Sequence, residues 1–222
     1  AASALLAVSG GGGGGFIAEI GGDLLGGSNT NGQTSAGDVS VLNLASITTA
    51  GDGAIGLAAL SHGGGNAFAG PITKGEQLIS IGNIGSSDGS SGEVSVLNSG
   101  VIFTEGAASP AMLTQSIGGG GVYAPVASDP EFYWLGNAST NTDGNAGGNI
   151  SIATNGNITT KGIGSQAMIA QSIGGGGGFL GDISPDSDGK SAALLGSQGP
   201  QGFNKQDTSA AWNKEWLDIV DN

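Results

Sequence analysis

The sequence predicts an all-β fold, a parallel β-solenoid in which coils of the chain stack on one another. The first observation behind this prediction is a repeat of about 55 residues, because such repeats bury a continuous core only by stacking. The second is a set of short runs in which apolar and small polar residues alternate, as in a strand with one buried face. The third is the glycine content, 47 of 222 residues, since each interior glycine costs a helix roughly 1 kcal/mol.

The repeat is visible in two motifs. A glycine, an acidic or amide residue and an alternating run such as VSVL open three units, at Gly37, Gly92 and Gly148. A serine precedes each glycine tract, at Ser9, Ser61, Ser116 and Ser172. The interval is nearly constant within each motif and is slightly shorter only between the first two serines. This spacing predicts that equivalent residues occupy equivalent positions in successive coils.

The spacing divides the chain into five parts. They are the tail of a truncated first repeat with its loop (1–35), three further repeats (36–91, 92–147 and 148–203) and a C-terminal capping or contact segment (204–222). The apolar run before Ser9 fits the end of a repeat better than a signal peptide, because no basic region precedes it. We therefore expect the chain to belong to a longer, processed or truncated protein.

Each repeat contains three short apolar runs separated by turns. The first is at 39–42, 94–97 and 150–153, the second at 46–49, 101–104 and 157–160, and the third at 57–60, 112–115 and 168–171. We expect each run to pair in parallel with its counterpart one coil along, with aliphatic side chains inside and Ser, Thr and Asn outside. A coil of roughly 20 residues would give a rod of order 50 Å.

Stretches of variable sequence follow the glycine tracts and predict long side loops on one face of the stack. The composition changes at about Asn204, beyond which glycine is absent and Trp212 and Trp216 stand four residues apart. That spacing predicts a short amphipathic helix that closes or crosses the stack. The alternative is an extended strand that joins a neighbouring chain.

Charge and composition exclude several classes of function. The chain has 18 acidic residues against 5 basic ones, all lysine, and a net charge of −13. Nucleic-acid binding needs Lys and Arg to neutralise phosphates, so we expect no nucleic-acid partner. No apolar run reaches 18 residues, so we expect no membrane insertion by this segment. Cysteine is absent, which excludes disulfides and thiolate chemistry.

Three aspartates, Asp182, Asp186 and Asp188, are weak candidates for calcium binding. An EF-hand loop here would also need an acidic or amide residue in place of Ser184 and a glutamate in place of Leu195. A solvated acidic loop is therefore the better interpretation. We expect no cofactor and no specific metal, although adventitious Ca²⁺ binding is compatible with so many acids.

We find no catalytic constellation in the sequence. His62 is the only histidine, so a triad or a His-based metal site lacks partners, and we expect this residue in a turn or on the surface. Acidic residues such as Asp38 and Glu105 stand mostly at predicted turns, where their local hydrogen bonds are expected. The glycine tracts match dinucleotide-binding motifs only trivially, because no helix is predicted to follow them.

The densest aromatic cluster is Phe132, Tyr133 and Trp134, in one of the variable stretches. Aromatic faces stack on sugars and on partner proteins, so these residues are contact candidates together with Trp212 and Trp216. The alternative is that the rings fold over the flank of the solenoid and are buried there.

The segment AMIAQSIGGGGG at 167–178, its counterpart at 112–121 and the preceding NISIATNGNITTKG resemble the repeats of large autotransporter passengers, the secreted parts of Gram-negative type V secretion proteins. The resemblance covers roughly residues 1–180. It implies a right-handed parallel β-helix, export to the cell surface and a role in adhesion or aggregation. The repeats ending at Ser9 and Ser61 depart from the AQSI pattern.

We therefore expect a non-catalytic structural or adhesive segment of a secreted protein at the bacterial cell surface. Its expected partners are neighbouring repeats, other copies of itself and host or matrix glycans. One alternative is a subunit of a self-assembling extracellular filament, because open coil ends present unpaired strands. A second is a carbohydrate-active β-helix enzyme, which would need two facing carboxylates.

Overall fold

The structure is a computed structural model, and every structural statement below concerns the residues that it describes. These are 4–11, 14–17, 24–26, 35–64, 66–69, 72–73, 78–83, 89–119, 121–128, 132–137, 146–174, 177–184 and 192–195. They form nineteen strands and no helix, and every strand pair is parallel. The predicted all-β class is therefore confirmed for this part of the chain, whereas the C-terminal segment 204–222 lies outside it.

The strands fall into four layers, one for each repeat. Layer 1 contains β1 (Leu5–Gly10), β2 (Gly14–Ile17) and β3 (Leu24–Gly26). Layer 2 contains β4 (Val39–Asn43), β5 (Ile47–Thr49), β6 (Leu57–His62), β7 (Asn66–Ala69), β8 (Ile72–Thr73) and β9 (Leu78–Asn83). Layer 3 contains β10 (Val94–Asn98), β11 (Ile102–Thr104), β12 (Met112–Ile117), β13 (Gly121–Ser128) and β14 (Phe132–Asn137). Layer 4 contains β15 (Ile150–Thr154), β16 (Ile158–Thr160), β17 (Met168–Ile173), β18 (Gly177–Ser184) and β19 (Ala192–Leu195).

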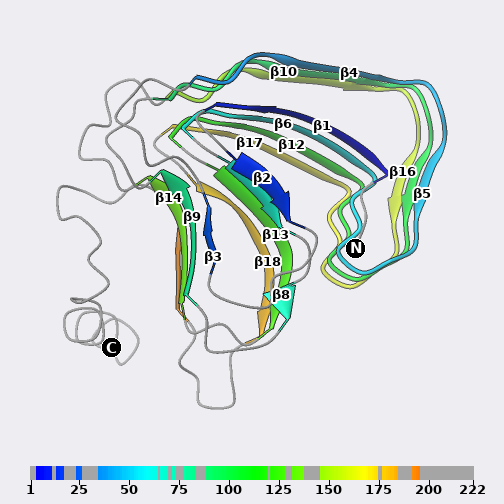
Figure 1. Ribbon diagram of the computed structural model, residues 1–222. Coiled ribbons are helices and arrows are strands. Elements are labelled where there is room, and N and C mark those ends of the chain that lie inside the picture. Colours follow the sequence, from blue (N-terminus) through cyan, green and yellow to red (C-terminus); the bar gives the residue numbers. More distant parts are fainter. Residues whose placement is uncertain are drawn as a thin grey trace, which may run out of the picture.

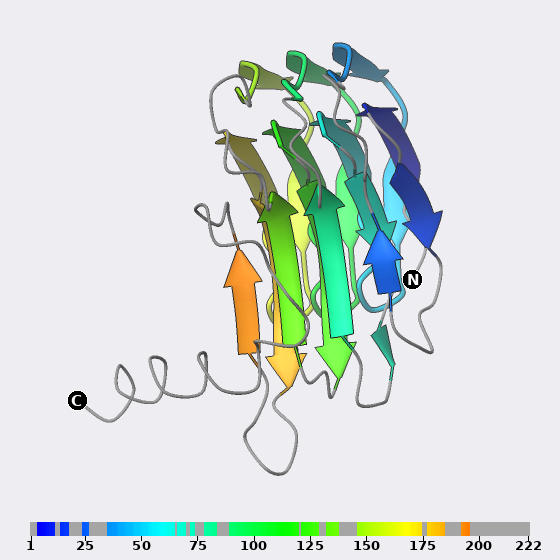
Figure 2. The same cartoon turned by 60° about the vertical axis from the view of Figure 1, so that its left-hand side comes forward.

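Five sheets run across these layers, and equivalent strands of successive repeats lie side by side in each (Figures 1 and 2). We call β1-β6-β12-β17 the central sheet, β4-β10-β15 the outer sheet and β5-β11-β16 the corner sheet. The remaining two sheets are β2-β7-β13-β18, in which β8 also pairs with β13, and β3-β9-β14-β19. Each repeat therefore contributes one strand, or two short ones, to each sheet that it reaches.

The register of the sheets is the one that the repeat predicts. Val96 is aligned with Val41 on one side and with Ile152 on the other. The serines that precede the glycine tracts are aligned in the central sheet. Equivalent residues across all layers therefore share a position, as the spacing indicates.

The expected coil length of roughly 20 residues is wrong. Paired residues lie a whole repeat apart in the chain, as Leu5 with Leu57 and Phe132 with Ala192 show. One layer is a whole repeat because the chain visits five sheets before it returns to its starting position. At about 4.8 Å per strand, four layers span only about 14 Å, far less than the expected rod.

A first apolar core lies between the central, outer and corner sheets. Strands β4 and β10 alternate strictly between buried and exposed positions, so one side of the outer sheet faces this core and the other faces solvent. The buried members of this first core are Val39, Val41, Ile47, Leu57, Ala59, Val94, Val96, Ile102, Ala111 and Met112. Aliphatic columns thus fill the interior, as the alternation predicts.

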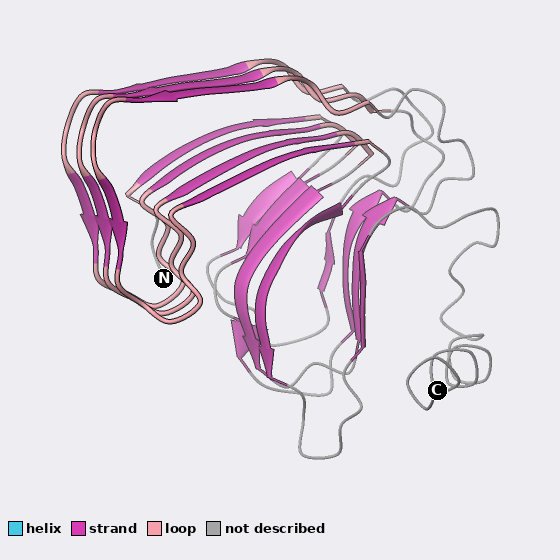
Figure 3. Cartoon of the chain, turned by 180° about the vertical axis from the view of Figure 1, so that it is seen from behind, coloured by secondary structure: helices cyan, strands magenta, loops and turns pink. Residues whose placement is uncertain are grey.

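The two inner strands of the central sheet, β6 and β12, are buried on both faces. All six residues of β6 and all six of β12 are buried. On the side opposite the first core, Ile55, Ala58, Leu60 and Leu113 form a second core, against which Ile169 packs. Figure 3 shows the central strands between the outer sheet and the sheet that contains β13.

One turn before the central sheet has the same left-handed backbone in three layers. Gly53, Ala108 and Gly164 have φ values of 66°, 47° and 69°. They occupy equivalent positions in successive repeats, so the stack imposes one backbone path on all of them. Layer 3 carries an alanine there, in a conformation that glycine adopts at lower cost.

Candidate functional site

The serines of the central sheet form a ladder of hydrogen bonds that ties each layer to the next. The Ser61 hydroxyl donates to the Gly37 carbonyl of its own layer at 2.9 Å and accepts from the Gly92 amide of the following layer at 2.9 Å. Ser116 repeats both bonds, with the Gly92 carbonyl and the Gly148 amide, each at 2.7 Å. The serine that precedes each glycine tract is therefore a structural clamp between the central sheet and the start of the outer strands.

An amide ladder follows the outer strands at the corner of the stack. The side chain of Asn43 donates to the Asn98 carboxamide oxygen at 2.7 Å, and Asn98 donates to the Thr154 hydroxyl at 3.1 Å. Asn98 also donates to the carbonyl of Gly100 at 2.9 Å. These bonds satisfy buried polar groups that would otherwise each cost about 1–3 kcal/mol.

A third ladder lies on the second-core side of the central sheet and includes the only histidine. The ring Nε2 of His62 lies 3.2 Å from Gln115 Oε1, and Gln115 Nε2 donates to Gln171 Oε1 at 2.7 Å. Since the amide nitrogen of Gln115 is directed to Gln171, its oxygen faces the histidine. Nε2 of His62 therefore carries the proton and donates, and Nδ1 is an acceptor.

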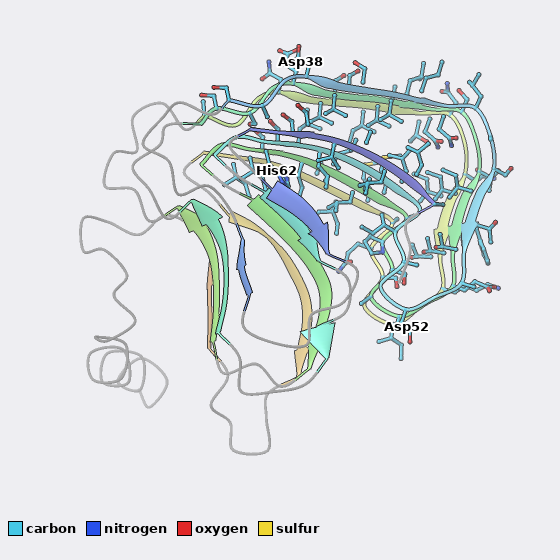
Figure 4. The ribbon with its side chains drawn as sticks, viewed as in Figure 1. Asp38, Asp52 and His62 are labelled. Carbon is cyan, nitrogen blue, oxygen red and sulfur yellow. The ribbon has the colours of Figure 1, made fainter. Side chains whose placement is uncertain are left out.

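His62 is 1% exposed and is the last residue of β6, so the expectation of a turn or surface position is wrong. It is aligned with Ile117 of the next layer and points toward the interior (Figure 4). Burial lowers the pKa of His62 from 6.5 to about 4, and the hydrogen bond with Gln115 partly opposes this shift. Because its pKa is about 4, the ring is neutral at pH 7. Nδ1 has no hydrogen-bond partner among the described residues, and leaving this buried acceptor unpaired costs stability.

The described acidic side chains serve the stacking of layers. Oδ1 of Asp38 accepts the amide of Glu93, and Oδ1 of Asp52 accepts the amide of Ala107, each in the next layer and at 2.8 Å. Figure 4 places the two aspartates in separate, outward-facing parts of the molecule. The hydrogen bonds of these two aspartates are therefore made to the next layer and not, as predicted, within their own turns.

One ion pair lies on the corner sheet. Lys161 Nζ is 3.6 Å from Glu105 Oε1 and 4.7 Å from the centre of the Phe103 ring. Both charged side chains are about half exposed or more, so the pair contributes little to stability. Within the described ranges no three metal-ligating side chains come together.

The residues predicted to make contacts are only partly described. Phe132, Tyr133 and Trp134 begin β14, where they are aligned with 78–80 and 192–194. Asp182 lies in β18. The remaining candidates, Asp186, Asp188, Trp212 and Trp216, lie outside the described residues. The predictions about these contact and calcium candidates stay predictions.

The ladder of His62, Gln115 and Gln171 was missed at the sequence level. The signal that could have found it is the recurrence of QSI at the same position in layers 3 and 4. A glutamine that recurs within an otherwise apolar strand indicates amide stacking between layers.

Comparisons with known proteins give no relative for this chain. No family model matches it, and the searches of curated proteins and of solved structures found no match. None of the described residues form a helix long and apolar enough to cross a membrane.

Proposed function

We propose that the chain is a non-catalytic structural segment of a parallel β-solenoid with a short C-terminal amphipathic helix. The observation that carries this proposal is the parallel, in-register pairing of equivalent strands from successive repeats in all five sheets. The serine, asparagine and glutamine ladders support it, because their side-chain hydrogen bonds join each layer to the next. The variable stretches, expected as side loops, instead supply strands such as β9 and β14 to two of the five sheets.

We further propose that this solenoid is part of a secreted, autotransporter-like protein at the bacterial cell surface, where it acts in adhesion. The support is the likeness of the AQSIGGGG segments to passenger repeats, together with a cysteine-free, acidic composition. The proposed contact residues are Phe132, Tyr133, Trp134, Trp212 and Trp216. Host or matrix glycans are the proposed ligands, because aromatic faces stack on sugars.

A deletion experiment tests the solenoid. Removing residues 92–147 takes out one repeat and joins Ser91 to Gly148, so each strand of layer 4 meets its equivalent in layer 2. We expect a folded protein with a strand-type circular dichroism spectrum and cooperative but weaker unfolding. Removing 92–119 instead takes out half a repeat and should abolish folding. Equal outcomes for the two deletions would contradict the proposal.

The adhesive role is tested with beads that carry the purified chain and with surfaces coated with glycans or matrix proteins. We expect binding that falls when Tyr133 and Trp134 are both replaced by alanine. Absence of binding to every coated surface, or cleavage of polysaccharides with a defined pH optimum, would overturn the non-catalytic adhesive role.

A filament subunit is a second candidate, favoured by the strands that end the sheets within the described part of the chain. Strands β15, β16 and β17 end their sheets on one side, and β1, β4 and β5 on the other. Edge strands of this kind pair with other chains unless they are covered. Long particles in negative-stain images would support this candidate, and monomers at high concentration would exclude it.

A further inference from the structure

Asn155 and Gly156 lie in the connection between β15 and β16, which joins the outer sheet to the corner sheet in layer 4. Within the described ranges, Asn155 is the only asparagine that a glycine follows directly. The sequence thus places a side-chain amide next to the backbone nitrogen of a glycine. The surroundings of these two groups decide whether they react with each other.

The stack requires a residue without a side chain at position 156. A Cβ on Gly156 would overlap the carbonyl oxygen of Gly100 in layer 3, and a Cβ on Gly100 would overlap that of Ala45 in layer 2. The backbones of successive layers therefore meet closely at this corner. Since glycine has no Cβ, no side chain of residue 156 shields its own amide nitrogen.

The Gly156 amide has no hydrogen-bond acceptor among the described residues. In layer 2 the equivalent amide, that of Ala45, donates to Asn43 Oδ1 at 3.3 Å. Layer 4 carries Thr154 in place of that asparagine, and the Thr154 hydroxyl donates to the Gly156 carbonyl at 3.2 Å. The amide of Gly100, which layer 4 covers, also has no acceptor in the described part of the chain. The open amide is therefore a property of this turn and not of the end of the stack.

The side chain of Asn155 is exposed and forms no hydrogen bond with the described residues. The residues at the same position in the layers below, Leu44 and Ser99, are exposed as well. A further layer lies above each of these two, so exposure here does not depend on where the stack ends. The Asn155 carboxamide is thus free to turn toward the nitrogen of the next residue.

A chemically similar pair, Asp52 and Gly53, is held by the neighbouring layer. The Gly53 amide donates to the Ala107 carbonyl, and Asp52 Oδ1 accepts the Ala107 amide, each at 2.8 Å. Both groups that would have to meet are engaged with layer 3. The stack therefore restrains one reactive pair and leaves the other unrestrained.

We propose that Asn155 and Gly156 form a site of spontaneous covalent modification, at which the chain is deamidated without an enzyme. The Gly156 nitrogen attacks Cγ of Asn155, the new C–N bond closes a succinimide ring, and the side-chain nitrogen leaves as ammonia with the proton of the attacking amide. Water then opens the ring. Cleavage between the Gly156 nitrogen and Cγ yields aspartate, whereas cleavage between this nitrogen and the backbone carbonyl carbon yields isoaspartate.

The isoaspartate product changes the backbone of layer 4, because the chain then runs through Cβ and Cγ and is one carbon atom longer between β15 and β16. The carbonyl of Asn157, two residues on, accepts the amide of Ile102 at 2.9 Å and leads into the pairing of β16 with β11. We expect the added atom to break this hydrogen bond. Modification would therefore loosen the corner of the stack irreversibly, whereas the aspartate product keeps the backbone path.

The test incubates the purified full chain in mildly alkaline buffer and maps its peptides by mass spectrometry. We expect Asn155 to convert to aspartate and isoaspartate, detected by the release of ammonia, by the mass gain at this residue and by an isoaspartyl methyltransferase. Its rate should lie within roughly tenfold of its rate in urea, whereas isomerisation of Asp52 should be at least about 100-fold slower in the folded chain than in urea. Conversion of Asn155 only in urea, or equal protection of the two sites, would overturn the proposal.

Matched variants identify the reacting residue. Asn155→Ser copies Ser99 of layer 3 and should remove the conversion while stability is retained. Asn149 is the control, because it is exposed in the same layer but its side chain donates to Glu93 Oε1 at 3.1 Å and a β-branched isoleucine follows it. Asn149→Ser should leave the conversion unchanged. A rate that falls equally in both variants would contradict the assignment.

Hydrogen exchange tests the effect on the corner. The Ile102 amide should exchange at least about tenfold faster in isoaspartate-rich protein than in fresh protein, and Asn155→Asp should show no such increase. Equal exchange in the three samples would contradict the proposed loosening. Both tests are independent of adhesion, because the reaction depends only on the backbone of this turn.

Discussion

Strands β10 and β12 lie in the same layer and are both internal strands of parallel sheets, yet their environments differ. In β10 the side chains alternate, with Val94, Val96 and Asn98 buried and the other two exposed. In β12 every side chain is buried. The outer sheet has one covered face, whereas the central sheet has cores on both faces. A strand's sequence pattern thus reflects how many of its faces are covered.

The two strands also differ in how many polar residues they bury. In β10 Ser95 is exposed, and only Asn98 is buried, with hydrogen bonds to both neighbouring layers. In β12 the buried polar residues Thr114, Gln115 and Ser116 each have a hydrogen bond to another layer or to the outer strand. Burial of a polar group is tolerated because the stack supplies the same partner in each layer.

The strongest test of this difference in burial is the same substitution at one leucine in each strand. Leu113→Asp in β12 should destabilise the protein by about 4 kcal/mol or more, since it places a carboxylate in the second core. Leu97→Asp in β10 should cost less than about 1 kcal/mol, because Leu97 is 43% exposed. The free energy of unfolding in urea measures both. Similar losses would mean that the outer sheet is covered on both faces.

A second prediction concerns the corner between the outer and corner sheets. A Cβ on Gly100 would overlap the carbonyl oxygen of Ala45 in the layer below, and backbone of this kind cannot move aside without breaking the asparagine ladder. We expect Gly100→Ala to lower the unfolding free energy by roughly 3 kcal/mol. Its neighbour Ser99, which is exposed, is the control, and Ser99→Ala should change stability by less than about 0.5 kcal/mol.

The third prediction concerns how the stability of the protein depends on pH through His62, which lies on the second-core side of the central sheet. In the unfolded chain the His62 side chain has a pKa of 6.5 and takes up a proton below that pH. In the folded chain its pKa is about 4, so it stays neutral until the pH is much lower. The contribution of neutral His62 is therefore complete above pH 6.5 and is lost as the pH falls through this window. Between pH 7 and pH 5 the loss is about 2 kcal/mol.

His62→Ile is the matched variant, because isoleucine occupies the same position in layers 3 and 4. It should remove this pH dependence, even though it leaves Gln115 Oε1 without its partner and so changes stability at pH 7. Urea titrations of both proteins at several pH values measure the difference. An unchanged slope between pH 7 and pH 5 would show that His62 is not the group responsible.

Much of the strand pairing could be predicted from the sequence because the residues that determine it recur at a nearly constant spacing. Residues such as Val41, Val96 and Ile152 recur with their surroundings, so a parallel stack in that register is the one that buries all of them together. The length of a layer could not be predicted in this way. The variable stretches that supply β9 and β14 have no common motif, so their strands did not appear as part of each coil.

The all-β class, the equivalence of the repeats and the inward side of the outer strands could all be derived from the sequence, since they depend on spacing and alternation along the chain. The burial of β6 and β12 on both faces and the interior position of His62 follow only from the folded arrangement. Burial depends on distant segments of the chain that cover a strand from either side, and no local pattern records which segments these are.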